Sequence, residues 1–201
     1  AIIAAHGAFD KRAGGGYNGG NGLGSGKNMQ RLPEGLKEKL CAWYDAGHRD
    51  LPWRQDREPY HVWLSEIMLQ QTRVEAVKGY YARFLTELPT IAALADCPPD
   101  RLTKLWEGLG YYSRVRNLQK AAKIIMEESG GVFPKTYDAV RALPGIGDYT
   151  AGAICSICFE LPTPAVDGNV LRVLSRVTED GASITAQKTK NTCREALLPL
   201  Y

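Results

Sequence analysis

The sequence predicts an all-α fold. Beyond residue 28, apolar residues recur at helical spacing, and no segment shows the sustained apolar and polar alternation of a half-buried strand. Glycine and proline divide these periodic segments into short runs. The chain has 201 residues, and 44% of them are hydrophobic, which suffices for one sizeable domain or two small ones.

Composition limits the classes of function. The formal net charge of +3 permits a polyanionic partner without requiring one. Five cysteines, at spacings unlike a disulfide framework, favour a reducing compartment. We therefore expect an intracellular protein, cytoplasmic or in the nucleoid if bacterial, and nuclear or mitochondrial if eukaryotic. No apolar run approaches the roughly 18 residues of a membrane helix, so we expect no membrane partner.

The first 28 residues differ from the rest, because nine of them are glycine and they lack helical periodicity. Such a segment buries too little surface to offset its ordering entropy. We expect residues 1–28 to be disordered, or to be a remnant of cloning or of an upstream region. We expect Met29 to lie nearer to a natural start than Ala1 does.

The helices are predicted in order from Pro33. Leu36, Leu40 and Trp43 share one face, and Gly47 behind them ends the first helix. Two prolines make residues 49–59 a loop. The later helices are expected at 60–71, 74–88, 90–94, 98–106, 112–130, 136–143, 148–159, 168–177 and 186–200.

A Pro144-Gly145-Ile146-Gly147 turn lies between two of these helices and predicts a tight helical hairpin. Gly145 and Gly147 allow the backbone to approach a ligand closely. Free amides at the start of the second helix suit a phosphate oxygen. The turn alone is equally compatible with an ordinary helical corner that Asp148 caps. Asp167, some twenty residues further on, favours the ligand-binding interpretation.

The hairpin together with Asp167 resembles the helix-hairpin-helix, Gly/Pro-rich loop and aspartate signature of a DNA glycosylase superfamily. That superfamily includes endonuclease III and the adenine glycosylases. Three further motifs are similar to its adenine-specific, MutY-type branch: Leu51-Pro52-Trp53-Arg54, Val62-Trp63-Leu64-Ser65-Glu66-Ile67-Met68-Leu69-Gln70-Gln71-Thr72 and Trp106-Glu107-Gly108-Leu109-Gly110-Tyr111-Tyr112-Ser113-Arg114. The resemblance covers about residues 36–176.

The resemblance implies a helix-hairpin-helix glycosylase fold, with two helical lobes and a cleft between them. Residues 59–143 are expected to form a bundle of the six-helix type, and residues 136–159 the hairpin. Residues 29–58 are expected to pack, as a helix and a loop, with the second lobe. That lobe is expected at 160–201, incomplete at its C-terminus.

Breaking an N-glycosidic bond to a purine calls for one protonated and one ionised acid. Periodicity alone predicts a solvated Glu66, and Asp167 alone is more often a helix cap. The resemblance implies instead that Glu66 protonates the adenine ring and that Asp167 stabilises the oxocarbenium-like sugar. Desolvation is then expected to raise the pKa of Glu66. The adenine would be flipped out of the duplex into the cleft.

Position 149 separates the branches of the superfamily. The endonuclease III branch carries there a lysine that forms a Schiff base with the sugar, whereas this chain has Tyr149. A phenol cannot form an imine, so we predict a monofunctional glycosylase. Tyr149 is a candidate hydrogen-bond partner beside Glu66, and Asn169 a candidate to orient Asp167 or water. Purely structural roles for both stay open.

The resemblance also assigns DNA contacts. Gln71 and Tyr111 match positions that enter the base stack where the adenine leaves. The other predicted DNA contacts are Gln70, Thr72, Gly145, Gly147 and Arg114, although a cationic helix face is also compatible with simple solvation. The residues predicted to line the adenine pocket are Arg49, Leu51, Trp53 and Arg54.

We predict no cofactor or metal within these 201 residues. The resemblance implies a [4Fe-4S] cluster in a full-length parent, and this chain ends before the four-cysteine motif. Cys155 and Cys158 form a C-x-x-C pair within a predicted apolar helix, without a second pair after it.

The predicted activity is removal of adenine mispaired with 8-oxoguanine or guanine, which leaves an abasic site. Double-stranded DNA is the predicted partner, and the protein is expected to act as a monomer. Two alternatives remain open: an endonuclease III-like glycosylase and lyase acting on damaged pyrimidines, and a non-catalytic DNA-binding fragment.

Overall fold

The computed structural model describes residues 28–201, and this part of the chain is helical without any β-strand. The all-α prediction is thus confirmed there. The glycine-rich segment lies, apart from Asn28, outside the described residues. The α-helices are α1 (Leu36–Gly47), α2 (Pro59–Leu69), α3 (Val74–Glu87), α4 (Ile91–Asp96), α5 (Pro99–Trp106), α6 (Ser113–Ser129), α7 (Tyr137–Ala142), α8 (Asp148–Phe159), α9 (Gly168–Val177) and α10 (Gln187–Leu197).

Helix boundaries mostly agree with the prediction, and those of α8 and α9 agree fully. The helix expected to reach Gln71 ends at Leu69, because Gln71 has a φ of 58° and a right-handed helix cannot continue through it. At the C-terminus α10 gives way to a 3₁₀ turn, Leu198–Leu200, where Pro199 lacks the N–H that an α-helix needs.

Threonine side chains begin two of the short helices. The Thr90 hydroxyl accepts a hydrogen bond from the Ala93 amide at the start of α4. The Thr136 hydroxyl accepts one from the Ala139 amide at the start of α7. Each cap is typically worth about 1 kcal/mol, which matters for helices of only six residues.

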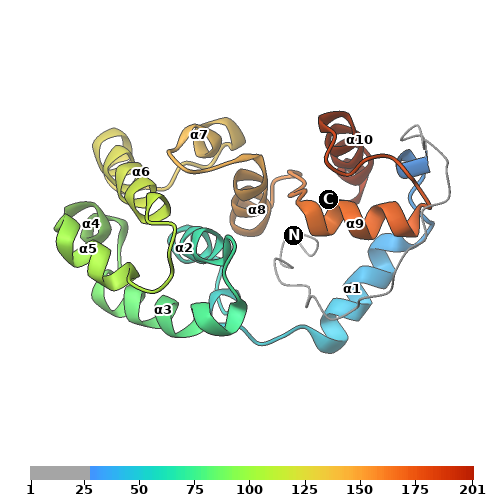
Figure 1. Cartoon of the computed structure of the whole chain (residues 1–201). Helices are drawn as coiled ribbons and strands as arrows, with labels where there is room; N and C mark the ends of the chain where they lie inside the picture. Colours follow the sequence, from blue (N-terminus) through green and yellow to red (C-terminus); the bar gives the residue numbers. More distant parts are fainter. Residues whose placement is uncertain (1–27) are drawn as a thin grey trace.

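Helices α2 to α8 share one hydrophobic core, and α2 lies at its centre (Figure 1). Helix α2 packs against α3, α6 and α8, while α4 and α5 pack against α6. Seven of the eleven residues of α2 are buried, so the helix is apolar nearly all round. Glu66 is therefore carried by one of the most enclosed helices of the protein.

Helices α9 and α10 form a second, smaller core with the 3₁₀ turn Asn28–Gln30. Met29 is fully buried in it, and the Met29 amide donates a 2.9 Å hydrogen bond to the buried Asp180 carboxylate. Helix α1 forms where it was predicted, yet none of its residues is buried. Leu36 is partly buried against the second core, whereas Trp43 is 53% exposed.

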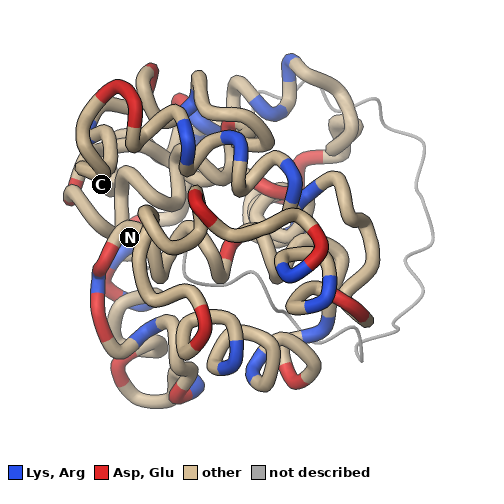
Figure 2. The backbone as a smooth tube through the Cα atoms, turned by 90° about the vertical axis from the view of Figure 1, so that its left-hand side faces the viewer, with Lys and Arg blue, Asp and Glu red and all other residues tan. Residues whose placement is uncertain are grey.

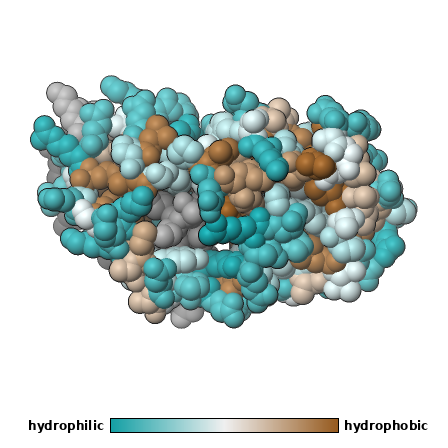
Figure 3. Space-filling view, turned by 180° about the vertical axis from the view of Figure 1, so that it is seen from behind, coloured by the Kyte–Doolittle hydropathy of each residue, from teal (hydrophilic) through white to brown (hydrophobic). Residues whose placement is uncertain are grey.

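The two groups of helices lie side by side, joined by the loop before α2 and by the segment between α8 and α9 (Figure 1). Viewed from behind, the surface is hollowed between them (Figure 3). Because α8 belongs to the first group and α9 begins the second, residues at the start of both helices can meet at this junction.

Basic and acidic positions are interspersed on the side formed by α3 to α6 (Figure 2). Several of them pair directly, for example Arg101 with Glu87 and Lys104 with Glu107. No helix in the described part of the chain is both long and apolar enough to cross a bilayer.

Phe84 tests the first core. Its ring is fully buried and packs edge-on against Trp106, with ring centroids 6.0 Å apart. We expect Phe84→Ala to lower the free energy of unfolding by about 3–5 kcal/mol in urea denaturation, because it leaves a cavity. The control Val132→Ala changes a side chain of a residue that is 61% exposed and should shift it by less than about 0.5 kcal/mol. Similar losses in both variants would contradict the assigned core.

Candidate active site

Glu66 lies on α2 and is partly buried. Desolvation raises its pKa from 4.5 to about 7, and the negative charge of Asp167 adds to the rise. A hydrogen bond from Tyr149 and the positive charge of Arg54 oppose the rise in part. A carboxyl group with this pKa is substantially protonated near neutral pH, so it can serve as an acid.

Tyr149 is the second residue of α8, and its hydroxyl is hydrogen-bonded to the Glu66 carboxyl. Burial, together with the nearby Glu66 and Asp167 charges, holds the pKa of Tyr149 well above its ordinary value. The phenol therefore stays protonated and donates the hydrogen bond. This contact joins the second hairpin helix directly to the acid on α2.

Asp167 caps the N-terminus of α9. Its Oδ1 accepts from the Asn169 and Val170 amides at 2.9 and 2.8 Å, and its Oδ2 accepts from Asn169 Nδ2 at 2.8 Å. The side-chain oxygen Oδ1 of Asn169 accepts in turn from Arg172 at 2.7 Å. The residue is thus both a helix cap and a member of the site, with a carboxylate whose orientation three donors fix.

Gly152 explains how the segment before Asp167 reaches this position. A Cβ added at Gly152 would lie 2.9 Å from the Pro164 carbonyl oxygen, so α8 and this segment pass in direct contact. The Thr163 hydroxyl donates a 3.2 Å hydrogen bond to the Gly152 carbonyl at the same crossing. The sequence alone predicted a helix through Gly152 but gave no explanation for a glycine there. The close approach of two backbone segments explains it.

The four predicted pocket residues have different environments. The positive charge of Arg54 acts on Glu66, and its guanidinium donates to the Arg49 carbonyl at 3.0 Å. Leu51 and Trp53 are buried in the first core, where the Trp53 ring meets Tyr81 edge-on at 5.5 Å. Arg49 is exposed. The structure thus brings Arg54 close to the acid, and contact of all four with adenine stays a prediction.

The hairpin turn between α7 and α8 exposes Gly145 and Gly147. Gly145 has a φ of 80°, and a Cβ there would lie 2.9 Å from Asn117 Cβ on α6. Glycine is therefore required at this position by both conformation and space. Gly147 is the N-cap residue of α8. The turn thus brings the backbone at the positive end of the α8 dipole to the surface, as a phosphate site requires.

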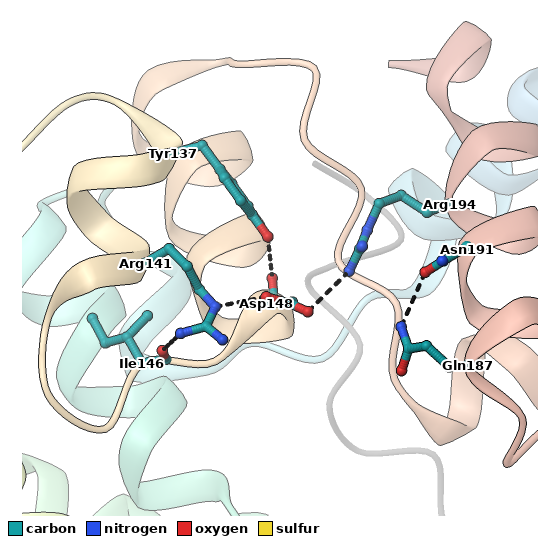
Figure 4. A network of polar contacts seen from close by, with 7 residues as sticks. All are labelled: Tyr137, Arg141, Ile146, Asp148, Gln187, Asn191 and Arg194. Carbon is teal, nitrogen blue, oxygen red and sulfur yellow. Dashed lines mark hydrogen bonds and ion pairs between the residues drawn. The ribbon is translucent and has the colours of Figure 1, made fainter.

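Asp148 does not cap α8, which corrects the alternative interpretation of the turn, because its side chain points to two arginines (Figure 4). It accepts from Arg141 of α7 at 2.6 Å and lies 3.8 Å from Arg194 of α10. Arg141 also donates to the Ile146 carbonyl in the turn. Hydrogen bonding to Arg141 lowers the pKa of Asp148. The two cations neutralise an acid that would otherwise repel a phosphate beside the turn.

Gln71 and Tyr111 are exposed, and both have left-handed backbone conformations, with φ of 58° and 47°. Gln70 and Thr72 are partly buried beside them. The Arg114 guanidinium, predicted to contact phosphate, is directed toward the backbone of this region, for example to the Gln70 and Leu109 carbonyls. The structure places these residues around Arg114, in a cluster distinct from the carboxylate pair.

The described residues do not offer a metal site. Within 28–201 no group of three or more histidine, cysteine, aspartate or glutamate side chains is placed to hold an ion. Burial raises the pKa of the Cys155 thiol to about 11 and that of Cys158 to about 12, so neither favours the thiolate that binds metal. These residues therefore do not fit a [4Fe-4S] cluster, which needs four thiolates.

Sequence reasoning identified Glu66, Tyr149, Asp167 and Asn169, which the fold brings together. It overlooked Gly152 and the arginines around Asp148. A glycine inside a helical pattern was the available signal for the first. Of the arginines, Arg194 had no local signal, because it comes from a helix more than forty residues further along the chain.

Comparison with known proteins identifies the family of this chain. Residues 64–199 match the HhH-GPD superfamily, described as base excision DNA repair proteins. The adenine DNA glycosylase of Rattus norvegicus is 48% identical over 160 residues, which are 75% of this chain and 31% of the relative. That of Homo sapiens is 49% identical over 156 residues, 73% of this chain and 29% of the relative. The chain thus spans about a third of the length of these relatives.

Solved structures show the same fold. A thermostable thymine-DNA glycosylase superposes with a TM-score of 0.71 at 24% identity, covering 87% of this chain and 84% of the other. Endonuclease III in a trapped covalent intermediate with DNA gives a TM-score of 0.67 at 22% identity, covering 82% and 75%. At these identities the comparison establishes the architecture and confirms the predicted fold class.

The raised pKa of Glu66 makes stability depend on pH. Between pH 4.5 and 7 the folded protein binds more protons at Glu66 than the unfolded chain, so stability falls as pH rises through this range. Glu66→Gln lacks this titration. We expect the stability difference between variant and wild type to move by about 1–3 kcal/mol in favour of the variant across this range, measured by urea denaturation.

The matched control for this titration is Glu128→Gln, which changes an exposed glutamate on α6. Its difference from wild type gives the baseline over the same pH range. If the difference for Glu66→Gln does not change with pH relative to this baseline, burial does not raise the pKa of Glu66.

Gly152→Ala tests the contact between α8 and the segment before Asp167. Alanine normally favours a helix over glycine by about 1 kcal/mol, yet here its methyl group would press on a backbone carbonyl. We expect a net loss of about 1–3 kcal/mol in the free energy of unfolding. Gly79→Ala on α3 is the control, since a Cβ there meets nothing within 4 Å, and it should stabilise the protein. Stabilisation by both substitutions would refute the close approach.

Proposed function

The chain belongs to the HhH-GPD superfamily of base excision DNA repair proteins, and on that premise we propose that it is the core of an adenine DNA glycosylase. Its substrate would be adenine mispaired with 8-oxoguanine or guanine, and its product an abasic site. Relatives that carry the name adenine DNA glycosylase at 48–49% identity support the choice of base. Because this chain spans about a third of their length, the activity of the whole protein belongs to the proposal.

The observation that carries this proposal is the pair formed by Glu66 and Asp167. An acid with a pKa of about 7 beside a fixed second carboxylate fits a reaction that needs both a proton donor and a negative charge. Glu66 would transfer its proton to a ring nitrogen of adenine. The electron pair of the N-glycosidic bond would then leave with a neutral base rather than an anion.

Asp167 would act on the sugar. As the bond breaks, positive charge develops at C1′ and the ring oxygen, and the Asp167 carboxylate would stabilise this charge. Its three hydrogen-bond donors keep the carboxylate oriented without reorganisation during the reaction. Water would add its oxygen to C1′, and the proton it releases would restore the acid form of the site.

Tyr149 supports simple hydrolysis over strand cleavage. It occupies the hairpin position where a lyase would need an amine, and its phenol donates to Glu66. The rival pyrimidine-specific lyase therefore lacks its nucleophile. The other rival, a module that only binds DNA, gives no reason for a glutamate whose pKa is raised to about 7 beside a second carboxylate.

DNA would approach the face that carries the hairpin. The exposed backbone at Gly145 and Gly147 would bind a phosphate, while Gln71 and Tyr111 would enter the base stack. We further propose that the protein acts as a monomer inside the cell, a location supported by five free cysteines. The [4Fe-4S] cluster would belong to a longer parent protein.

Single-turnover cleavage of a duplex with one adenine opposite 8-oxoguanine tests this function. We expect strand breaks in wild type only after hot alkali, because the product is an abasic site. Glu66→Gln should lose about 10²-fold or more in rate, the usual scale of general acid catalysis, while duplex binding survives. Glu128→Gln, an exposed glutamate on α6, should keep the wild-type rate.

Other outcomes of this assay identify the rivals. Breaks without alkali, together with a covalent adduct trapped by borohydride, would indicate a lyase. DNA binding without breaks in either protein would indicate that this chain binds DNA but does not catalyse its cleavage.

A further inference from the structure

Two exposed segments of the first group of helices share an unusual backbone. Gln71, just beyond α2, and Tyr111, just before α6, have left-handed φ values that non-glycine residues rarely adopt. Both side chains are exposed, and Tyr111 is 60% exposed. Such strain persists only where neighbouring groups determine the conformation. Since these side chains contribute little burial of their own, the restraint must come from elsewhere.

The Arg114 side chain reaches both segments. One of its terminal nitrogens, Nη1, donates to carbonyls at the end of α2, and the other, Nη2, donates mainly to the turn before α6. Two of the α2 carbonyls lie in the last turn of the helix, where intrahelical donors are missing. The acceptors are Ile67 O at 2.9 Å, Met68 O at 3.1 Å, Gln70 O at 2.5 Å, Thr72 Oγ1 at 3.4 Å, Leu109 O at 3.0 Å and Gly110 O at 3.3 Å.

Aromatic rings enclose the same guanidinium. Its central carbon lies 5.4 Å from the centroid of the buried Trp106 ring and 5.5 Å from that of Tyr111. Arg114 Nε is buried and has no hydrogen-bond partner among the described residues. The guanidinium therefore points into the protein, between the two segments, rather than outward to a phosphate.

We propose that Arg114 is a positioning residue that ties the end of α2 to the turn before α6, and so holds Gln71 and Tyr111 ready to enter a DNA base stack. The inference rests on the proposed function, because it assumes that these two side chains open the duplex. In this proposal Arg114 binds backbone carbonyls, and not the phosphate that was predicted from the sequence. A lysine cannot substitute, since its single nitrogen lacks the planar fork that serves both segments.

Hydrogen exchange of the 201-residue chain tests the structural part of the proposal, which is that Arg114 holds the two segments. In Arg114→Lys, which keeps the charge, amides of residues 70–73 and 109–113 should exchange about tenfold faster, while those of the buried α2 core stay protected. Arg83→Lys is the control, because Arg83 also stacks on a ring, that of Tyr80, and donates to a carbonyl, Leu105 O, but touches neither segment. Unchanged exchange in Arg114→Lys would overturn the proposal.

The functional part of the proposal is that Arg114 helps to open the base stack. It is tested with 2-aminopurine in place of the target adenine, because the fluorescence of 2-aminopurine rises when this base leaves the stack. Arg114→Lys should reduce the opening equilibrium about tenfold, whereas affinity for a duplex that already carries an abasic analogue should change by less than about twofold. A phosphate contact or a general loss of stability would instead weaken binding of both duplexes equally, and that result would overturn the proposal.

The two failures can be distinguished. If the wild-type chain binds the duplex but leaves 2-aminopurine stacked, the proposed function is wrong, and with it the role of Arg114 in opening DNA. The exchange experiment uses no DNA and still reports whether Arg114 holds the two segments. If Arg114→Lys opens the base stack as well as the wild type does, the inference about Arg114 is overturned, while the proposed glycosylase function stands.

Discussion

The central constraint on this structure is that two carboxyl groups, those of Glu66 and Asp167, lie close together in a partly desolvated site. Raising the pKa of Glu66 from 4.5 to about 7 corresponds to a penalty on its ionised form on the order of 3 kcal/mol. Packing of the fold offsets this penalty, because Glu66 lies on α2, which the surrounding helices enclose. Asp167 is held separately, by amides at the start of α9. Neither group could move away without breaking contacts that stabilise the fold.

Helix α8 connects this pair to the hairpin. Tyr149 and Gly152 lie one turn apart on it, so both face the same junction between the two groups of helices. Tyr149 contacts Glu66, and Gly152 lets the segment that leads to Asp167 pass close by. Because α8 begins at the hairpin turn, a ligand bound at that turn would be placed relative to both carboxylates by one rigid element.

Local sequence signals predicted the helices well, since caps, prolines and apolar spacing act within a few residues. Periodicity predicted a solvated Glu66 and missed its environment, because its partner Asp167 is about a hundred residues away in the chain and other helices enclose most of α2. The resemblance supplied that pairing. The direction of the Arg114 side chain was also inaccessible, because an arginine on a helix looks the same whether it faces solvent or backbone carbonyls.

The locally unfavourable features of this chain lie close together in the fold. A partly buried glutamate, left-handed Gln71 and Tyr111, and a glycine inside α8 are each unfavourable in isolation, and they lie on or next to α2, α6 and α8. Each is accompanied by a specific contact: Tyr149 bonds Glu66, Arg114 bonds the segments of Gln71 and Tyr111, and the segment before Asp167 passes against Gly152. Such clustering is expected where a fold gives up local stability for a site. In the proposed function, this cluster rather than the formal net charge of +3 would set the position of the duplex.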